Sequence, residues 1–215
     1  MKAKIEIIEE RSGWIAVNKP AGISVHNTEK GVNLLSILRD QVGYSLHAVH
    51  RLDSPTSGVI LLAKNAQQTQ ILQQCLTIAT KEYTAILRGV VEPAEGNWTW
   101  RISNKGEGFR NPRGRKSDQV AALTSFRTIR SNKYLSLVNL KLGTGRQHQI
   151  RKHAALANHP VIFDRRYGDR RYNAKLEQRY GVNHLCLCAT KLDLMINSER
   201  VSLEVTSPKS WSLFL

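Results

Sequence analysis

The sequence predicts an α+β fold, in which a mixed and mainly antiparallel sheet carries a few flanking helices. Two observations support this fold class. Short segments with strand-like patterns outnumber the helical ones, and most connections between them have the length of hairpin loops. The chain has 215 residues, of which 41% are hydrophobic. This is enough for a sizeable core, and we expect a single domain over residues 1–215, with room for two lobes.

Strands are predicted where short apolar or alternating segments are bounded by turn residues. These segments are 5–8, 14–17, 59–63, 83–91, 120–129, 134–142, 184–196 and 200–206. The run VILLA at 59–63 is apolar throughout, which is typical of a strand buried on both faces. The stretch EPAEGNW at 92–98 is expected to form a turn between strands.

Helices are predicted where apolar residues recur with a period near 3.6. The three candidates are 32–38, 66–79 and 146–157. In the first candidate, 32–38 is the range of the apolar residues, and the helix is expected to stop at Gly43. The second candidate places its apolar residues on one face. The third, RQHQIRKHAALA, follows a glycine-rich turn and is expected to be a basic helix.

The charge balance is the unusual feature of the composition. The chain has 32 Lys and Arg residues against 17 Asp and Glu residues, a formal net charge of +15, with a pI of about 10.1. An excess of this size repels itself unless a polyanionic partner neutralises it, and nucleic acid is the simplest such partner. An anionic membrane surface is the lesser alternative, because the sequence has no basic amphipathic helix of the kind that lies on bilayers.

Two segments carry much of this charge. The first, residues 101–116, is rich in Gly and Asn and lacks apolar periodicity, so we expect a mobile loop. The second segment contains Arg146, Arg151, Lys152, Arg165, Arg166, Arg170 and Arg171. Such cations contact phosphates with little sequence demand. The interleaved Phe109, Tyr167 and Tyr172 either stack on unpaired bases or fill the edge of the core. An ordinary solvated surface is the alternative for both segments.

Several classes of protein are excluded by what the sequence lacks. It contains no secretory signal and no apolar run long enough to span a bilayer. Its three cysteines, two of them in a C-x-C spacing, match neither a disulfide framework nor a zinc ribbon. We therefore expect a reduced, cytoplasmic protein. No Walker, G-x-G-x-x-G, H-E-x-x-H or G-x-S-x-G motif is present. His148 and His153 lie five residues apart, off a common helix face, and we expect no metal site.

The segment HRLDSPTSG at residues 50–58 has the strongest chemical character. Asp53 follows Arg51 in a turn that leads into a buried strand, where a nearby cation keeps a carboxylate ionised. The alternative is that Asp53 caps a turn or makes a structural ion pair. A second polar segment, TGRQHQIR at 144–151, supplies cations that would meet such a carboxylate if the fold brought them together.

Four segments together resemble the RluA-type pseudouridine synthases. They are VNKPAGISVH at 17–26, HRLDSPTSGVILLAK at 50–64, KEYTA at 81–85 and LGTGRQHQIRKH at 142–153. They follow the family patterns VNKPxGxxVH, HRLDxxTSGxxxxAK, KxYxA and TGRxHQIRxH in the family order. The resemblance implies a pseudouridine-synthase fold with a basic RNA-binding cleft. Because the chain begins almost directly at the first of these motifs, we expect no separate N-terminal RNA-binding module. It implies an isomerase that converts uridine to pseudouridine in structured tRNA or rRNA.

The resemblance also implies roles for individual residues. Asp53 matches the catalytic aspartate, Tyr83 the tyrosine that stacks against the target base, and Arg151 the basic residue that pairs with the aspartate. Arg51 matches the arginine beside the flipped nucleotide, and Ile150 either packs near the base or belongs to the core. Further substrate or RNA contacts are expected at Lys19, His26, Arg110, Arg113, Arg115, Lys116, Arg146, His148 and Gln149.

The chain departs from the family pattern in two places. Where the family usually reads GHPIxGD, residues 158–164 read NHPVIFD, with Asn158 and Phe163 in place of glycines. Cys188 stands at the histidine of the family sequence LHA. We expect Phe163 to reshape the loop over the site. Both differences concern the identity of the substrate more than the type of reaction.

The implied reaction detaches uracil from its sugar, turns it and rejoins it through carbon 5. It needs no redox partner, group donor or energy source, so we expect no cofactor. We also expect the protein to be a monomer and its partner to be RNA. The alternative is a non-catalytic RNA-binding or ribosome assembly factor on the same fold, which would have no need of Asp53, Tyr83 and Arg151. The hypothesis of a DNA-binding protein rests on net charge alone, because the sequence shows no recognisable recognition helix.

Overall fold

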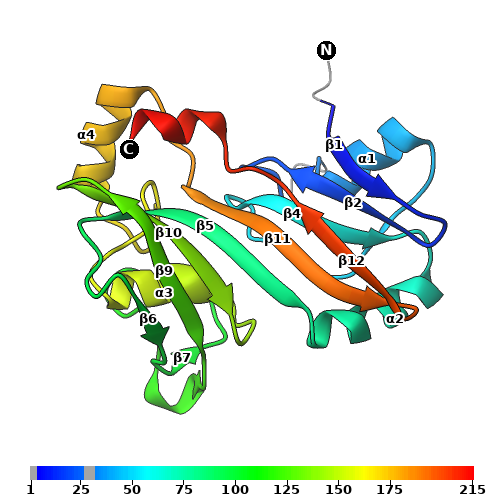
Figure 1. Ribbon diagram of the computed structural model, residues 1–215, viewed down its shortest axis with the longest axis horizontal. Helices are drawn as coiled ribbons and strands as arrows, with labels where there is room; N and C mark the ends of the chain where they lie inside the picture. Colours follow the sequence, from blue (N-terminus) through cyan, green and yellow to red (C-terminus); the bar gives the residue numbers. More distant parts are fainter. Residues whose placement is uncertain (1–3, 27–31) are drawn as a thin grey trace. The chain divides into compact units, whose positions relative to one another are not determined.

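The computed structural model describes residues 4–26 and 32–215 and has the predicted α+β character (Figure 1). Its α-helices are α1 (Leu34–Val42), α2 (Ala66–Thr77), α3 (Gln149–Leu156) and α4 (Arg170–Tyr180). Short 3₁₀ helices occupy η1 (Lys116–Asp118) and η2 (Lys209–Leu213). The strands are β1 (Glu6–Glu10), β2 (Trp14–Lys19), β3 (His47–Ala48), β4 (Ser57–Ala63), β5 (Thr80–Arg88), β6 (Glu95–Trp98), β7 (Ile102–Ser103), β8 (Gln119–Val120), β9 (Thr124–Ser131), β10 (Leu135–Leu142), β11 (Leu187–Ile196) and β12 (Glu199–Glu204).

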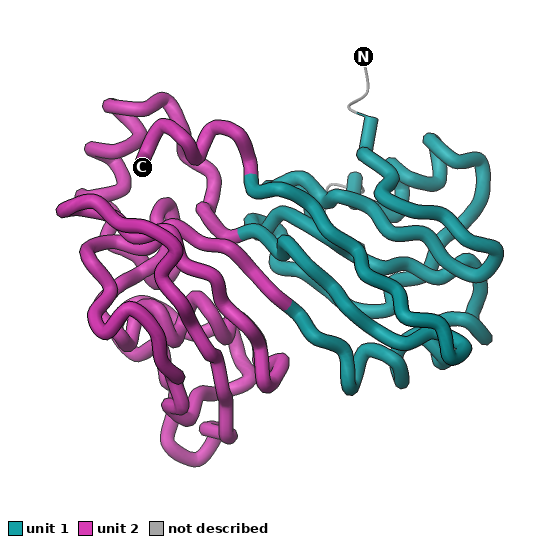
Figure 2. The backbone as a smooth tube through the Cα atoms, viewed as in Figure 1, with its two compact units in different colours: residues 1–81, 188–207 teal, residues 82–187, 208–215 magenta. Residues whose placement is uncertain are grey.

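The chain divides into two compact units, coloured separately in Figure 2. Unit 1 comprises residues 1–81 and 188–207, and unit 2 comprises residues 82–187 and 208–215. Each unit has its own strands and helices. The expectation of one catalytic domain over the whole chain stays a prediction.

The sheet of unit 1 is centred on β4, the strand predicted to be buried on both faces. All seven residues of β4 are buried. It pairs antiparallel with β2 and with β3, and parallel with β11 through its first two residues. The outer strands β1 and β12 pair with β2 and β11. Helix α2 adds Leu72 and Leu76 to the core that these strands form.

Gly58 allows β4 and β11 to run parallel at close range. Its φ is +112°, and a Cβ built on it would overlap the carbonyl oxygen of Ala189 and lie 2.6 Å from the nitrogen of that residue. Ala189 is its register partner on β11. Only glycine combines this backbone conformation with this approach, which explains the glycine of the segment TSG at 56–58.

The main sheet of unit 2 has the order β5-β10-β9-β6, antiparallel throughout. The segment 160–162 runs beside β5, because Arg88 N–H donates to Pro160 C=O at 3.0 Å and Ile162 N–H donates to Ile86 C=O at 2.9 Å. These backbone bonds fix the start of the loop that leads to α4.

Strand β3 (His47–Ala48) was not predicted, and three longer segments also differ from the sequence prediction. Helix α4 was not predicted; Asp169 caps its start and Gly181, with φ +67°, ends it. The expected turn at 92–98 contains strand β6, which pairs with β9. The expected loop at 101–116 contains β7, which pairs with β8. In all three segments apolar residues are too sparse to show a clear period.

The longest α-helix in the described part of the chain has 12 residues, and no helix there is long and apolar enough to cross a membrane.

Candidate active site

Asp53 lies in a tight turn that leads into β4. Thr56 N–H donates to Asp53 C=O at 3.0 Å, and Gly22 N–H donates to Ser54 C=O at 2.8 Å. The flanking Leu52 and Thr56 are buried, whereas Asp53 itself is half-buried. The turn therefore holds this residue at the boundary between core and solvent.

Lys19 stabilises this turn through hydrogen bonds. Its side chain is 0% exposed, and its ammonium group donates to the carbonyl oxygens of Pro20 (3.0 Å), Ile23 (2.9 Å) and Ser54 (3.0 Å). Burial lowers the pKa of Lys19 to about 8, and the negative charge of Asp53 acts in the opposite direction. We expected Lys19 among the RNA contacts. In the structure its ammonium protons join loop 20–23 to the Asp53 turn, and the RNA contact stays a prediction.

His50 fixes the start of the same segment. Its Nε2 accepts a hydrogen bond from Leu61 N–H of β4 at 3.1 Å, which requires Nε2 to be unprotonated. Burial lowers the pKa of His50 to about 4, and the positive charge of Lys81 contributes in the same direction. The imidazole is therefore neutral at physiological pH and acts as an acceptor within the fold.

The other predicted residues of these segments differ in exposure. Tyr83, on β5, is half-buried and lies opposite Leu140 of β10. Arg51 is exposed, and His26 is half-buried with its carbonyl oxygen bonded by the Ser24 hydroxyl. Ile150 is buried on α3, which agrees with the core alternative for this residue.

The turn before α3 is organised by Gln149. Its Oε1 accepts from the Thr144 hydroxyl at 2.7 Å and from Arg146 N–H at 3.0 Å, and its Nε2 donates to Leu123 C=O at 2.8 Å. Gln149 is buried, and both ends of its amide form hydrogen bonds within the protein; the expected contact of Gln149 with RNA stays a prediction. His148 adopts φ +55° at the start of the helix, with Nδ1 2.9 Å from the Tyr167 hydroxyl.

Arg151 is held by the carboxylate of Asp164. Its Nε and Nη2 donate to Asp164 at 2.7 and 2.9 Å, in a pair whose side chains are 6% and 0% exposed. Asp164 Oδ1 also accepts from the backbone N–H groups of Arg166 and Tyr167. A bidentate, charge-assisted pair fixes the guanidinium plane. The guanidinium carbon also lies 5.2 Å from the centre of the Tyr167 ring.

Two further polar residues of α3 are buried. The ammonium of Lys152 donates to the carbonyl oxygens of Ser103 (2.8 Å) and Lys105 (2.7 Å). His153 contacts the Thr124 hydroxyl and Trp100 C=O through its two ring nitrogens, and burial lowers its pKa. The predicted helix is present, but its basic residues Arg151 and Lys152 are not on the surface. Buried polar groups need partners, and distant segments provide them here.

The segment 101–116 is attached to the rest of unit 2 at several points. Besides the Lys152 bonds, Arg166 donates to Glu107 C=O at 2.6 Å and to Gly106 C=O at 2.9 Å. Arg146 is half-buried and donates from Nε to Ala121 C=O at 3.2 Å. The predicted RNA contacts of the segment are all exposed: Arg110, Arg113, Arg115 and Lys116.

Both residues that replace family glycines adopt left-handed backbone conformations. The φ of Asn158 is +62° and that of Phe163 is +60°, a region that glycine adopts without strain. The Phe163 ring is buried, with its centre 5.9 Å from that of Phe214, whose ring centre lies 4.8 Å from that of Tyr180. Phe163 thus packs against the C-terminal segment, which also contacts α4.

Cys188 is buried on β11, opposite Ser57 in the register. Burial raises the pKa of its thiol, and a hydrogen bond with Ser57 partly offsets this effect. A neutral thiol here behaves as a small apolar side chain. Among residues 4–26 and 32–215, no three His, Cys, Asp or Glu side chains are grouped so as to hold a metal ion.

Asp164 and Lys152 have supporting roles that sequence reasoning missed. Asp164 ends the stretch NHPVIFD and Lys152 lies within LGTGRQHQIRKH, so both fall in segments that carry the family resemblance. Their positions in these patterns were the available signal. Their partners were not predictable, because Arg151 and Ser103 lie 13 and 49 positions away along the chain.

Comparison with known proteins identifies the family. The family described as RNA pseudouridylate synthase matches residues 13–156. A protein of Pectobacterium carotovorum subsp. carotovorum named tRNA pseudouridine synthase C is 33% identical over 96% of this chain, which spans only 60% of that relative's length. The protein of the same name from Haemophilus ducreyi is 32% identical, over 88% of this chain and 84% of its own length. That from Yersinia pestis is 33% identical, over 96% of this chain and 88% of its own length.

Solved structures agree on the fold. Human RNA pseudouridylate synthase domain containing 1 superimposes with a TM-score of 0.80 at 24% identity, over 98% of this chain and 86% of that chain. Human RNA pseudouridylate synthase domain containing 4 gives a TM-score of 0.77 at 23% identity, over 96% and 92%. The predicted pseudouridine-synthase fold is confirmed. The chain belongs to the RluA-type RNA pseudouridylate synthase family, isomerases that convert uridine in RNA to pseudouridine.

Proposed function

We propose that this chain forms pseudouridine in structured tRNA, with Asp53 as the catalytic carboxylate. The observation that carries this proposal is the turn of Asp53, which presents a half-buried carboxylate and is fastened by the buried Lys19. The bacterial relatives are named for tRNA, so tRNA is the first substrate to test, and rRNA is the second.

Asp53 acts in its ionised form in this proposal. Either it attacks the sugar carbon that carries the base, or it removes the 2′ proton of the sugar. In both routes the uracil leaves, turns and bonds to the sugar again through carbon 5, so all atoms of the nucleotide are retained. The target nucleotide must leave its stack to reach Asp53, and Tyr83 then stacks against the base. Water must be excluded while the base is detached.

Arg151 is proposed as the positive partner of the aspartate, a role that rests on the family resemblance. A guanidinium beside a carboxylate favours the charged form of that carboxylate. The bidentate bond to Asp164 prevents the Arg151 guanidinium from rotating. Preorganised charges of this kind need no rearrangement during the reaction, and such electrostatic stabilisation is usually the largest contribution to catalysis.

The exposed cations Arg110, Arg113, Arg115 and Lys116 are proposed to contact the RNA backbone. Their segment is tied to the rest of unit 2 through Lys152 and Arg166, so the cations are presented from a supported loop. The remaining predicted contacts are proposed to lie beside the bound RNA: Arg51, His26, Arg146 and His148. We also propose that the protein acts as a monomer in the cytoplasm.

Removal of the Asp53 carboxylate tests the proposal. Purified wild type and the variants Asp53→Asn and Asp53→Ala are incubated with unmodified tRNA transcripts and with rRNA fragments, and pseudouridine is mapped chemically. We expect modification by the wild type and a loss of more than about 10³-fold in rate for both variants, equivalent to about 4 kcal/mol of barrier. RNA affinity should stay within about twofold of wild type, since the phosphate contacts are unchanged.

The control is Asp40→Asn, which removes an exposed carboxylate from α1 of the same unit. It should retain full activity. Turnover retained by Asp53→Asn would remove Asp53 from its role. A wild type that binds RNA but modifies neither tRNA nor rRNA would instead favour the non-catalytic assembly factor.

A further inference from the structure

The positive charge of the chain is concentrated in one of its two units. Unit 2 contains 21 Lys and Arg residues against 8 Asp and Glu residues, a net charge of +13. Unit 1 contains 11 against 9, a net charge of +2. The need for a polyanionic partner that follows from the composition therefore concerns unit 2.

Helix α4 carries a stripe of cations along its outer face. Arg171, Lys175 and Arg179 are all exposed and follow one another at intervals of four residues, so they line one side of the helix over about 12 Å. Within the described residues none of the three forms an ion pair with a carboxylate, and Arg179 stacks on Tyr180 at 5.3 Å. Like charges at this spacing destabilise a helix, so the stripe is unfavourable without an anionic partner.

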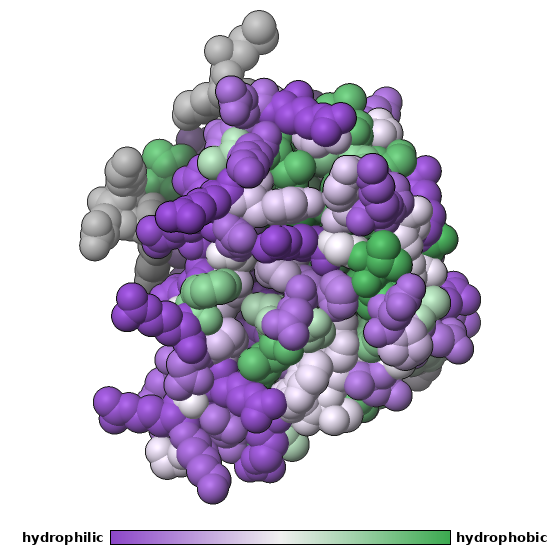
Figure 3. Space-filling view, turned by 90° about the vertical axis from the view of Figure 1, so that its left-hand side faces the viewer, coloured by the Kyte–Doolittle hydropathy of each residue, from purple (hydrophilic) through white to green (hydrophobic). Residues whose placement is uncertain are grey.

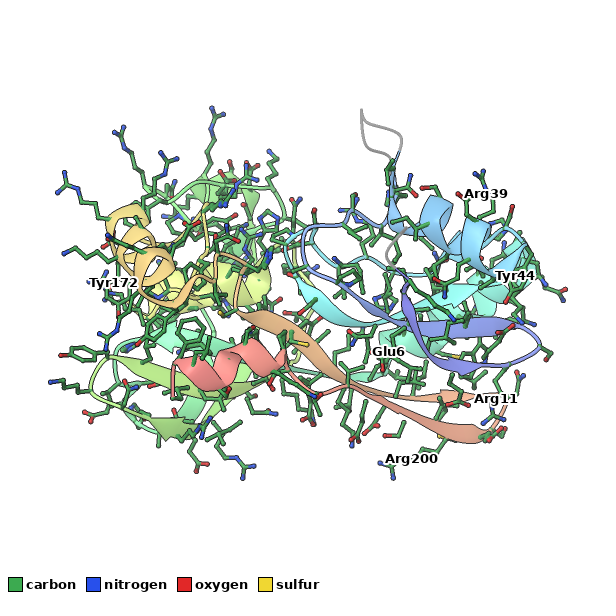
Figure 4. The ribbon with its side chains drawn as sticks, turned by 90° about the horizontal axis from the view of Figure 1, so that it is seen from above. Glu6, Arg11, Arg39, Tyr44, Tyr172 and Arg200 are labelled. Carbon is green, nitrogen blue, oxygen red and sulfur yellow. The ribbon has the colours of Figure 1, made fainter. Side chains whose placement is uncertain are left out.

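Other side chains of α4, Tyr172 on the flank of the stripe and Asn173 and Tyr180 on the opposite face, attach the helix to the rest of unit 2. The Tyr172 ring centre lies 4.5 Å from the Arg88 guanidinium, and the Tyr180 ring lies 4.8 Å from that of Phe214. The Asn173 amide accepts from the backbone N–H of residue 163 at 3.0 Å and donates to the carbonyl oxygen of residue 164 at 3.3 Å. Figure 4 shows Tyr172 at α4, with long side chains that end in nitrogen projecting outward around the helix. The helix is therefore a supported platform for its cations.

The two basic segments of the sequence meet in space within unit 2. Arg166, which precedes α4, donates to the carbonyl oxygens of Gly106 and Glu107. The cations of segment 101–116 and those of segment 165–179 thus belong to neighbouring parts of one surface. Figure 3 looks toward the side on which α4 lies in Figure 1, and this face is mainly hydrophilic.

We propose that the α4 stripe, defined as Arg171, Lys175 and Arg179, is a contact surface for the RNA backbone, additional to the loop cations already assigned. The proposal rests on the proposed function in taking RNA as the partner. Because Asn173 bonds to the backbone of residues 163 and 164, the stripe is attached to the segment that holds Arg151 through its carboxylate. RNA bound to the stripe is therefore held at a fixed position relative to Arg151.

The test is the triple variant Arg171→Gln, Lys175→Gln, Arg179→Gln, chosen because glutamine has a good helix propensity. Binding of an unmodified tRNA transcript is measured by fluorescence anisotropy from ~0.05 to ~0.5 M salt. We expect the slope of log affinity against log salt to fall by about 2–3, with an affinity loss of about 10- to 100-fold near ~0.1 M salt.

Two controls make the result specific. The variant Arg127→Gln, Arg130→Gln, Lys141→Gln removes three exposed cations from β9 and β10 of the same unit. It should change the slope of log affinity against log salt by no more than about 1, the value of a single phosphate contact. The variant Arg171→Lys, Arg179→Lys keeps the charges of the stripe and should bind like wild type. Circular dichroism verifies that each variant is folded, and single substitutions replace any triple variant that is not. An equal loss in the β9–β10 control, an unchanged slope in the α4 variant, or a large loss in the lysine variant overturns the proposal.

Measurements of pseudouridine formation distinguish a failure of this inference from a failure of the proposed function. The glutamine variant should raise KM for tRNA about 10-fold or more, while kcat at saturating tRNA stays within about twofold, because the stripe does not touch the reacting atoms. A wild type without pseudouridine activity contradicts the proposed function and leaves the binding measurement intact. A fall in kcat with unchanged affinity contradicts the α4 assignment alone.

Discussion

Phe163 shows at the scale of a single residue how packing and backbone strain oppose each other. Its φ of +60° disfavours a side chain, whereas its ring is buried against Phe214. We predict that Phe163→Gly and Phe163→Ala both lose about 2–4 kcal/mol of unfolding free energy through lost aromatic packing. The glycine variant should be the more stable by about 1 kcal/mol, because it alone escapes the strain. Urea unfolding measures both, and an alanine variant more stable than the glycine variant would refute the argument.

His50 makes the stability of the fold depend on pH. Its pKa is about 4 in the folded protein against 6.5 for the ordinary group. The unfolded chain therefore binds more protons between these values, and stability falls as the pH drops from 6.5 toward 4. Replacement by glutamine, which can still accept from Leu61 N–H, should remove this loss, on the order of 3 kcal/mol. The check is urea unfolding of wild type and His50→Gln at two pH values, near neutrality and near the lower pKa. A difference between the two proteins that does not change with pH would contradict the prediction.

At the scale of secondary-structure elements, Gly58 allows strands β4 and β11 to pair closely. A Cβ at this position would overlap the backbone of Ala189, and both strands contribute to the core of unit 1. We predict that Gly58→Ala costs more than about 3 kcal/mol. Gly43, at the end of α1, has φ +84° and open space around it, so Gly43→Ala should cost only about 1 kcal/mol. Thermal unfolding compares the two variants, and similar losses would show that the close approach does not matter.

Helix α3 shows at the same scale how polar residues organise a small unit. The side chains of Gln149, Arg151, Lys152 and His153 reach partners in the segments 100–105 and 123–124 and at residue 164. The helix has eight residues, so it contributes little apolar area of its own. Its polar side chains instead hold the surrounding loops in place.

At the scale of the whole molecule, the uneven distribution of charge determines how salt affects RNA binding. We predict that neutralising Arg110, Arg113, Arg115 and Lys116 to glutamine lowers the slope of log affinity against log salt by about 3–4, since each phosphate contact contributes about 0.9. Anisotropy titrations over a range of salt concentrations provide the measurement. An unchanged slope would show that this loop does not touch the RNA backbone.

The elements with regular apolar patterns were predictable from the sequence. The run at 59–63 lies in β4, the helical face at 66–79 lies in α2, and Gly43 ends α1 as expected. Apolar periodicity reports which face of an element meets the core, so these predictions needed no knowledge of distant residues.

The burial of polar side chains could not be predicted from the sequence. Lys19, Gln149 and Lys152 are all buried, although local pattern rules place such residues at the surface. Their burial depends on carbonyl and hydroxyl groups that other segments supply. Helix α4 was missed for a related reason, since its aromatic contacts come from two tyrosines, Tyr172 and Tyr180, in a charged stretch. The turn before β4 was predicted, but the side chains that hold it were not.

The burial of Lys19 and Lys152 has a practical consequence for experiments in solution. Amine-acylating reagents label accessible lysines, so these two positions should stay unmodified while exposed lysines react. Each reports on a different loop, Lys19 on the turn that carries Asp53 and Lys152 on the segment 103–105. Mass spectrometry of labelled protein would therefore detect local opening of either loop through an unaltered native side chain.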